Sequence, residues 1–295
     1  MHPLRASFEA TGMIESGSAP RSWLFVPADS NKKMMKALSS EADAVIFDLE
    51  DSVALSQKAT ARELLGLLPD RTDGEPERWV RINPLGTDAH RDDLELLEEL
   101  DIDGVVLPKA ECGDDVADLA AALAPRHLPI HAIVTETARS LFGLLSYNDC
   151  CSSLAAMSWG AEDLSAALGA SSKYGADGKL AFTYQMARSL CLAGAVAADV
   201  QPIDGVFADF RDEAGLMAEA RAAAAEGFTG KLAIHPAQVG PINAAFTPSI
   251  EEINHAQEII AAFELEPEAG VLSVGGKMVD RPHLVQARRV LARSR

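Results

Sequence analysis

The pattern of a buried strand that turns into a helix is found in Ile133-Val134-Thr135-Glu136-Thr137-Ala138-Arg139-Ser140. Its first residues close an apolar run, 129–134, whose length suits a strand inside a sheet. A carboxylate, Glu136, follows where the run stops, and a helix-like segment begins at Arg139. The next apolar run, 155–159, is followed in the same way by Gly160-Ala161-Glu162-Asp163. This repeated order of strand, acid and helix is typical of the units of a parallel α/β fold.

Glu136 and Asp163 are candidate metal ligands. Acids that end adjacent parallel strands bring their carboxylates side by side at one edge of the sheet. Mg²⁺ prefers oxygen ligands and commonly takes one or two carboxylates, while waters or substrate complete its shell. An acidic turn can also follow any strand for structural reasons. These two acids alone therefore favour a metal site only slightly, and the remaining strand ends decide the question.

The same alternation extends over most of the chain. Short apolar runs are nearly all separated by segments with a helical pattern, which implies a parallel sheet, and eight such units imply an α/β fold of the (β/α)8 TIM-barrel type. A doubly wound open sheet is the alternative, but no G-x-G-x-x-G motif follows any run. The expected strands lie at 22–27, 44–50, 79–83, 104–109, 129–134, 155–159, 205–209 and 231–235.

The composition is that of an ordinary globular protein, with 48% hydrophobic and 24% charged residues. The net charge of −18 argues against a nucleic-acid or anionic membrane partner, although a few local Arg and Lys residues can still bind a small anion. No apolar run approaches the ~20 residues of a membrane span. The N-terminus lacks the apolar block of a signal peptide, and the cysteines lack metal-ligand spacing. These features favour a cytoplasmic protein.

The chain is expected to divide into three segments. Residues 1–20 are rich in small and polar side chains and are expected to form a flexible N-terminal tail. Residues 21–247 hold the eight barrel units. Residues 248–295 exceed these units and carry two amphipathic helical patterns, so they form an additional C-terminal helical segment. Such an extra helix pair needs a surface to cover, which its own barrel or a neighbouring subunit can provide.

Ionisable residues stand at the end of almost every expected strand. The C-terminal ends of the strands build the active site of this barrel, so these groups are expected to gather at one mouth. A salt bridge or a turn could explain any one of them. Apolar strands that almost all end in ionisable groups favour an enzyme over a structural explanation. The groups are Asp48, Glu50, Arg81, Lys109, Glu136, Asp163, Asp209 and His235.

Chemistry suggests a role for several of these groups. Arg81 carries a planar guanidinium that suits a substrate carboxylate, although a salt bridge to Asp48 or Glu50 explains it nearly as well. Asp48 and Glu50 are candidates for holding water on a bound metal. Lys109 is expected to pair with these acids. His235 precedes a proline and is interpreted as a structural hydrogen-bonding residue outside the catalytic set.

Six motifs in this chain resemble those of the HpcH/HpaI aldolase and citrate lyase β-subunit family. They occur in the same order and with suitable spacing, and the likeness continues to about His283. The resemblance implies a Mg²⁺-dependent barrel that cleaves or forms a carbon–carbon bond beside a thioester carbonyl. The motifs are Arg21-Ser-Trp-Leu-Phe-Val-Pro, Phe47-Asp-Leu-Glu-Asp-Ser-Val, Arg81-Ile-Asn-Pro, Leu107-Pro-Lys, Glu136-Thr-Ala and Gly160-Ala-Glu-Asp-Leu.

The resemblance also implies roles for single residues. Matched position by position, Glu136 and Asp163 are the metal ligands and Arg81 holds the keto-acid carboxylate, while Arg21, Asn31 and Lys32 match positions near the phosphates of coenzyme A. Arg81 and Glu50 are further taken as candidate catalytic residues, and Arg81 and Glu136 as candidate substrate-binding residues.

The tail carries a further likeness. Gly276-Lys-Met-Val-Asp280-Arg-Pro-His resembles the C-terminal motif of malyl-CoA and citramalyl-CoA lyases. The resemblance implies that residues 248–295 pack on a neighbouring subunit of a homotrimer or hexamer. Asp280 would there act as the acid–base group of the adjacent active site, and the substrate would be a free acyl-CoA. A polar loop that serves only packing could carry the same residues.

The expected reaction is a reversible retro-Claisen cleavage of a β-hydroxyacyl-CoA such as citramalyl-, malyl- or citryl-CoA. An acyl-CoA thioester and a small keto acid are thus the expected partners. One alternative is a metal-dependent aldolase that uses free aldehydes without coenzyme A. Another is a β subunit, catalytically inactive by itself, in a complex with an acyl-carrier protein.

Overall fold

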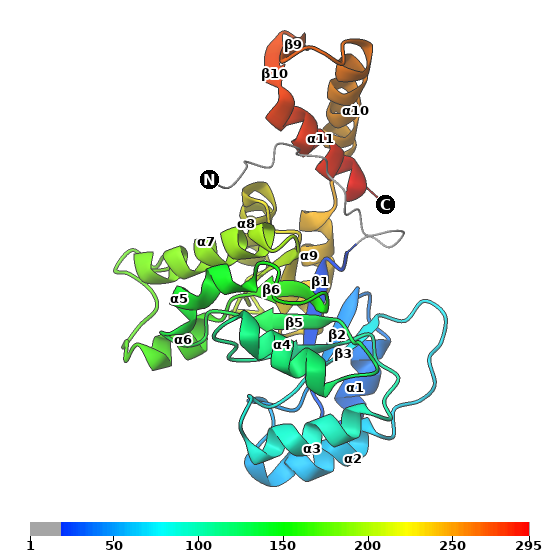
Figure 1. Ribbon diagram of the computed structural model, residues 1–295, viewed down its shortest axis with the longest axis vertical. Helices are drawn as coiled ribbons and strands as arrows, with labels where there is room; N and C mark the ends of the chain where they lie inside the picture. Colours follow the sequence, from blue (N-terminus) through cyan, green and yellow to red (C-terminus); the bar gives the residue numbers. More distant parts are fainter. Residues whose placement is uncertain (1–18, 295) are drawn as a thin grey trace, which may run out of the picture. The chain divides into compact units, whose positions relative to one another are not determined.

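A closed barrel of parallel strands forms the larger part of the structure, a computed structural model that describes residues 19–294. Within these residues, eight strands pair in chain order and β8 pairs back with β1 (Figure 1). The expected (β/α)8 architecture is confirmed. The strands are β1 (Ser22–Pro27), β2 (Ala44–Asp48), β3 (Glu77–Arg81), β4 (Gly104–Leu107), β5 (Ile130–Ile133), β6 (Leu154–Ser158), β7 (Gln201–Asp204) and β8 (Gly230–Ala233).

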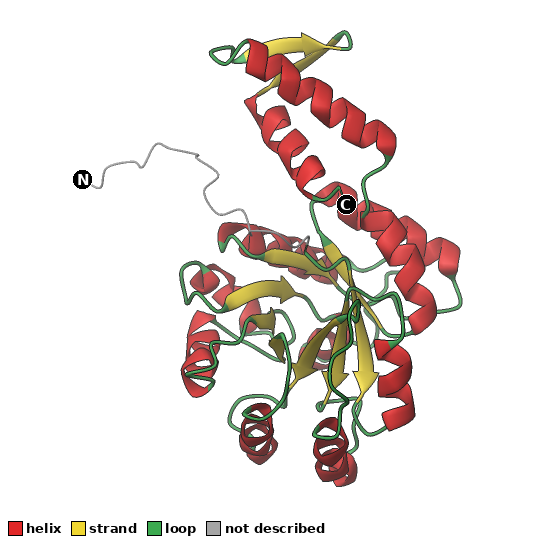
Figure 2. Cartoon of the chain, turned by 90° about the vertical axis from the view of Figure 1, so that its right-hand side faces the viewer, coloured by secondary structure: helices red, strands yellow, loops and turns green. Residues whose placement is uncertain are grey.

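Helices surround the strands (Figure 2) and bury the outer face of the barrel under a continuous apolar layer. Among the described residues, short 3-10 helices join or extend several of them. The helices of the barrel unit are α1 (Asn31–Leu38), η1 (Leu55–Gln57), α2 (Lys58–Leu65), α3 (Asp88–Leu97), α4 (Gly113–Ala122), α5 (Ser140–Gly143), η2 (Leu144–Tyr147), α6 (Ala161–Ala167), α7 (Phe182–Ala197), α8 (Glu213–Glu226), η3 (Pro236–Gln238) and α9 (Val239–Phe246).

A second apolar cluster fills the inside of the barrel. It includes Trp23 of β1 and Trp79 of β3, whose rings meet edge to face at 4.8 Å between centroids. The buried His131 of β5 lies against Trp23 at 5.0 Å between centroids and contacts the Ser158 hydroxyl at 2.8 Å. Burial lowers the pKa of His131 to about 3, so this imidazole is uncharged at neutral pH. The interior is therefore a packed core and not a channel.

The strand register brings the expected site residues to neighbouring strand ends. Asp48 of β2 lies opposite Arg81 of β3, and Ile133 of β5 lies opposite Ser158 of β6. The segments that follow β5 and β6 leave the barrel side by side, with the Val134 amide donating to the Ser158 carbonyl at 2.9 Å.

The expected position of the seventh strand is wrong. β7 covers Gln201–Asp204, whereas 205–209 forms the loop that follows it. Asp204 is buried, and its charge is compensated by hydrogen bonds from Lys231 and Arg188, each at 2.8 Å. This buried ion cluster makes the strand polar, so its sequence does not read as an apolar run. Asp209 consequently lies in an exposed turn, where its side chain accepts the Arg211 amide.

The described residues fall into two compact units, one of residues 20–247 and one of residues 248–294 together with residue 19. The smaller unit has its own apolar core, which includes Phe263 and Leu284. The segment expected as a polar loop contains a hairpin, because Gly275 and Gly276 both adopt positive φ and close its tight turn. The elements of this unit are α10 (Ile250–Leu265), β9 (Val271–Val274), β10 (Lys277–Asp280) and α11 (Arg281–Ala292).

The N-terminal tail expected over residues 1–20 lies, up to residue 18, outside the described part of the chain. None of the helices in the described part has the length and apolar character needed to cross a membrane.

Candidate active site

Glu136 is a buried carboxylate at the mouth of the barrel. It follows β5 by a short turn, is 4% exposed, and accepts the backbone N–H of Lys109 at 2.6 Å. Burial raises its pKa to about 8, with a further contribution from the nearby charge of Asp163. A charge at Glu136 therefore needs a cation close by, and Arg81 and Lys109 compensate it only in part.

Asp163 belongs to the first turn of α6 and not to the end of β6 itself. Gly160 stands at the N-cap of this helix, between Glu136 and Asp163 in the sequence. A side chain at this position would collide with Glu136, because an added Cβ would lie 2.7 Å from its Cγ and 3.0 Å from its Oε1. The absence of a side chain at Gly160 thus leaves Glu136 the space beside Asp163.

Gly160→Ala is expected to weaken Mg²⁺ binding by about tenfold. The new methyl group must displace the Glu136 side chain, and overpacking of this kind costs ~1–3 kcal/mol, with ~1.4 kcal/mol for each factor of ten in affinity. Titration calorimetry with Mg²⁺ measures the effect. Gly240→Ala is a matched control, because its Cβ would meet no atom within 4 Å. Equal affinities for the two variants would contradict the expected crowding.

Arg81 is engaged by acids of the neighbouring strand. Its Nε and Nη2 donate to the two oxygens of Asp48 at 2.7 and 2.6 Å, and its Nη1 lies 3.0 Å from Glu50. Although burial opposes a charge on Asp48, the Arg81 guanidinium holds the pKa of this carboxyl below its ordinary value. The salt bridges considered from the sequence are therefore present. A guanidinium has five N–H donors, so these three contacts leave donors for a further anion.

Lys109 connects the loop after β2, which carries Glu50 and Asp51, to Asp163 of α6. Its ammonium contacts Glu50, Asp51 at 2.9 Å and Asp163 at 3.3 Å. Burial opposes its charge, but the hydrogen bonds to Glu50 and Asp51 prevail and raise its pKa. The expected pairing of Lys109 with acids is thus observed, and it extends to Asp163.

The donor set at this mouth fits Mg²⁺. Glu136 and Asp163 could supply hard oxygen ligands, because they are two carboxylates close enough to interact. No group of three or more His, Cys, Asp or Glu residues that could enclose a metal occurs within residues 19–294. Mg²⁺ does not require one, since it is commonly held by one or two carboxylates together with water and substrate oxygens.

Arg21 does not belong to this mouth, contrary to expectation. It precedes β1, whereas Asn31 and Lys32 follow that strand at the exposed start of α1. Its guanidinium is bound by Asp43, which precedes β2, at 2.8 Å and by Thr247 at 2.6 Å. Arg21 therefore lies at the N-terminal end of the barrel, and the length of β1 separates it from Asn31 and Lys32.

Two further candidates have local structural partners. His235 caps η3 by accepting the Ala237 amide at 3.1 Å and stacks on Phe210, in agreement with the structural interpretation. Asp280 stands at the N-cap of α11, where its side chain meets His283. The hydrogen bond from His283 lowers the pKa of Asp280.

Some residues of the site were missed from the sequence. Asp51 contacts Lys109 and follows Glu50 directly, so its place after a strand was the available signal. Lys58 donates to the carbonyls of Leu49 and Glu50 and to Asn83 at 2.7 Å, and thereby fixes the loop that carries Glu50. No local pattern marks Lys58, because its partners come from two different loops.

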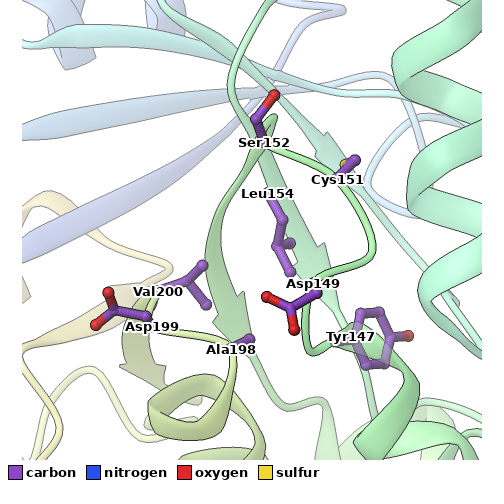
Figure 3. A pocket seen from close by; sticks show the side chains of 8 residues that line it. All are labelled: Tyr147, Asp149, Cys151, Ser152, Leu154, Ala198, Asp199 and Val200. Atoms are coloured by element: carbon purple, nitrogen blue, oxygen red, sulfur yellow. The ribbon is translucent and has the colours of Figure 1, made fainter. Parts of the chain in front are cut away.

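A pocket of about 390 Å³ lies at the opposite end of the barrel. Figure 3 shows its lining, which includes Tyr147, Asp149, Leu154 and Asp199. Leu154 begins β6 and Val200 precedes β7, so this pocket opens where the strands start. Catalytic residues of such barrels come from the other end of the strands. The pocket is therefore separate from the candidate active site.

Two family models match this chain. Residues 21–236 match the model of the HpcH/HpaI aldolase/citrate lyase family. Residues 181–295 match a model described as C-C bond lyase of the TIM-barrel fold. The two matches together span both compact units of the chain.

Individual relatives are similar over nearly their whole length. (3S)-malyl-CoA thioesterase of Cereibacter sphaeroides is 41% identical, over 93% of this chain and 94% of the relative. Human mitochondrial citramalyl-CoA lyase is 33% identical, over 90% of this chain and 83% of the relative. The crystal structure of CitE from Mycobacterium tuberculosis with magnesium, acetoacetate and coenzyme A has a TM-score of 0.80 and 38% identity, over 94% of this chain and 98% of that one.

Proposed function

We propose that this chain, which belongs to the HpcH/HpaI aldolase/citrate lyase family and is a carbon–carbon lyase, cleaves a β-hydroxyacyl-CoA in a reversible, Mg²⁺-dependent retro-Claisen reaction. Acetyl-CoA and a 2-keto acid are the products. The candidate substrates are citramalyl-, malyl- and citryl-CoA. Relatives that are named for malyl-CoA and citramalyl-CoA, and a relative that binds coenzyme A, support this class of substrate.

The observation that carries the proposal is the meeting of two acids and a guanidinium at one mouth. Lys109 donates its backbone N–H to Glu136 at 2.6 Å, and its ammonium lies 3.3 Å from Asp163. Glu50 contacts both Lys109 and Arg81, so three different βα units bring the two acids and the guanidinium to the same mouth. A β-hydroxy acid or 2-keto acid presents a carboxylate next to an oxygen atom. A cation held by two carboxylates, with an arginine beside it, matches that pair of groups.

In the proposed site, Glu136 and Asp163 hold Mg²⁺ and Arg81 binds the substrate carboxylate with its remaining donors. When bound, Mg²⁺ supplies Lewis-acid stabilisation and a template for the hydroxy-acid end of the substrate. Glu50 accepts from Arg81 and Lys109, so we assign it the positioning of these two cations. The exposed Asn31 and Lys32 remain the candidate contacts for the phosphates of coenzyme A.

Cleavage breaks the carbon–carbon bond and turns the hydroxyl carbon into the carbonyl of the keto acid, with loss of the hydroxyl proton. It also requires a proton at the carbon that leaves as the enolate of acetyl-CoA. We assign this proton to Asp280 of a neighbouring subunit in a homotrimer or hexamer. The chemistry of the barrel supports the need for an additional group, because Glu136 and Asp163 are committed to the metal and Glu50 is paired with cations. In the condensation direction, Asp280 would remove the same proton from acetyl-CoA.

Thioester hydrolysis is a second candidate function. The specific observation in its favour is the 41% identity to a (3S)-malyl-CoA thioesterase. Hydrolysis of malyl-CoA releases malate and free coenzyme A, whereas retro-Claisen cleavage releases acetyl-CoA and glyoxylate. The two reactions therefore differ in the form in which coenzyme A leaves.

Purified protein incubated with malyl-, citramalyl- and citryl-CoA tests the proposal. Chromatography should detect acetyl-CoA and the matching keto acid with at least one thioester in the presence of Mg²⁺, and neither product with EDTA. Free coenzyme A without acetyl-CoA would favour the thioesterase. Turnover of free 2-keto acids and aldehydes, with every thioester left intact, would instead indicate an aldolase that works without coenzyme A.

Arg81→Lys is expected to lower kcat/KM by roughly tenfold or more. Lysine keeps the charge but loses the planar fork, and charge-assisted hydrogen bonds contribute ~1.5–3 kcal/mol, with ~1.4 kcal/mol for each factor of ten in rate. Steady-state kinetics with the keto acid in the condensation direction measure the effect. Because Arg81 also binds Asp48, the substitution can lower the stability of the fold, so the thermal unfolding temperature of the variant must be measured as well. Unchanged kcat/KM for the keto acid would contradict the assignment.

A further inference from the structure

Lys109 has an unusual backbone conformation for a residue with a side chain. It directly follows β4 and Pro108, and its φ of 54° lies in the left-handed region. This region is disfavoured for residues that carry a Cβ, so surrounding contacts must hold it. Asp51, Glu50 and Asp163 supply such contacts through the ammonium group.

The strained conformation brings Lys109 to both candidate metal ligands at once. Its backbone N–H donates to Glu136 Oε2 at 2.6 Å, while its Nζ lies 3.3 Å from Asp163 Oδ1. A hydrogen bond to Glu136 fixes the direction of that carboxylate. The ammonium, in turn, places a positive charge on the other acid of the pair.

The neighbouring arginine cannot replace this charge. Arg81 directs three of its donors at Asp48 and Glu50, and no ion pair between Arg81 and Asp163 is found in the described part of the chain. Asp163 therefore has Lys109 as its cationic partner there. Glu50 and Asp51 offer Lys109 two other carboxylates besides Asp163.

We propose that Lys109 is a built-in counter-cation of the metal site, which holds Asp163 in the metal-free protein and withdraws to Glu50 and Asp51 when a divalent cation binds. This inference rests on the proposed function in taking Glu136 and Asp163 as the metal ligands. An ammonium and a divalent cation repel each other strongly at the same carboxylate. Metal binding must therefore break the contact between Lys109 and Asp163, while the backbone bond to Glu136 can persist.

The exchange has two consequences. The metal-free site stays ordered, because Lys109 offsets the repulsion between clustered acids. The same residue competes with the metal and so lowers the affinity of the site. Removal of the ammonium should thus tighten metal binding, which is the opposite of what loss of a purely supporting residue would do.

A titration of the protein with Mn²⁺, followed by electron paramagnetic resonance of the free ion, tests this competition. Lys109→Met, which keeps the side-chain length and removes the charge, is expected to bind Mn²⁺ about tenfold more tightly than the parent. Lys109→Arg keeps a cation and should stay within about threefold of the parent. In EDTA, Lys109→Met should unfold at a lower temperature than the parent. Equal or weaker Mn²⁺ binding by a folded Lys109→Met protein would overturn the proposal.

Crystal structures of the unaltered protein decide the matter even if the variant does not fold. With EDTA, Nζ should lie within salt-bridge distance of Asp163, and with Mg²⁺ it should contact only Glu50 and Asp51. A contact with Asp163 in both states would refute the exchange while leaving the metal site intact. No Mg²⁺ at Glu136 and Asp163, together with no Mn²⁺ binding by the parent, would instead overturn the metal site of the proposed function and the exchange with it.

Discussion

Asp163→Asn is expected to abolish Mg²⁺-dependent turnover, with a loss of about a hundredfold or more in both activity and metal affinity. Asparagine has the same shape but presents a neutral amide, so the site keeps Glu136 as its remaining carboxylate ligand. Mg²⁺ binds poorly without charged oxygen ligands. Calorimetric titration with Mg²⁺ and assays with and without EDTA measure the two losses.

A matched control is available in the same protein. Asp209 was also expected at a strand end, but it lies in an exposed turn after β7. Asp209→Asn should retain activity and metal affinity, because the amide oxygen can still accept the Arg211 N–H. The proposed metal site would be refuted by an Asp163→Asn protein that binds Mg²⁺ as tightly as the parent.

The architecture could be predicted from the sequence because the strands of a (β/α)8 barrel are buried on both faces and read as short apolar runs. The same regularity places strand ends at one mouth, so Glu136, Asp163 and Arg81 were found as neighbours. β7 was misplaced because Asp204 is buried with Lys231 and Arg188, which no local pattern reveals. Tertiary ion pairing there overrides the apolar pattern on which strand prediction depends.

The roles of charged residues were harder to predict than their positions. The sequence left open whether Arg81 binds a substrate carboxylate or forms a salt bridge. The structure shows salt bridges to both Asp48 and Glu50. The contact between Lys109 and Asp163 joins residues from different βα units, so spacing could not predict it. Arg21 was wrongly grouped with Asn31 and Lys32 near the coenzyme A phosphates. It precedes β1 and they follow it, so the length of this strand separates them.

In residues 248–294, the local sequence predicts the structure better than it predicts the role of Asp280. Gly275-Gly276 between short apolar segments is a hairpin signal, and the hairpin of β9 and β10 could have been read from it. That hairpin ends at Asp280, which the first turn of α11 uses as a cap. Capping by itself explains an aspartate at this position, so local geometry does not distinguish a structural from a catalytic role.

Asp280→Asn separates these two roles. Asparagine caps helices about as well as aspartate, so the thermal stability of the variant should match that of the parent. It cannot exchange a proton at the substrate, so turnover should fall by about a hundredfold or more if Asp280 is the acid–base group. Loss of stability together with activity would favour the structural role. Full activity would exclude the catalytic one.

The proposed exchange of tails between subunits predicts recovery of activity in mixed oligomers. Asp280→Asn subunits keep an intact metal pair, and Asp163→Asn subunits keep an intact Asp280. If the two proteins are unfolded and refolded together in equal amounts, a site works when its barrel comes from the first and its tail from the second. Random assembly of a ring gives about one quarter of such sites, and hence about a quarter of the parent activity. A tail that serves its own barrel gives no working site in any mixture, because each subunit then lacks one of the two groups. Native mass spectrometry should verify that the subunits mix. Mixed oligomers without activity would rule out the exchange, and activity near a quarter would place Asp280 in the active site of the neighbouring subunit.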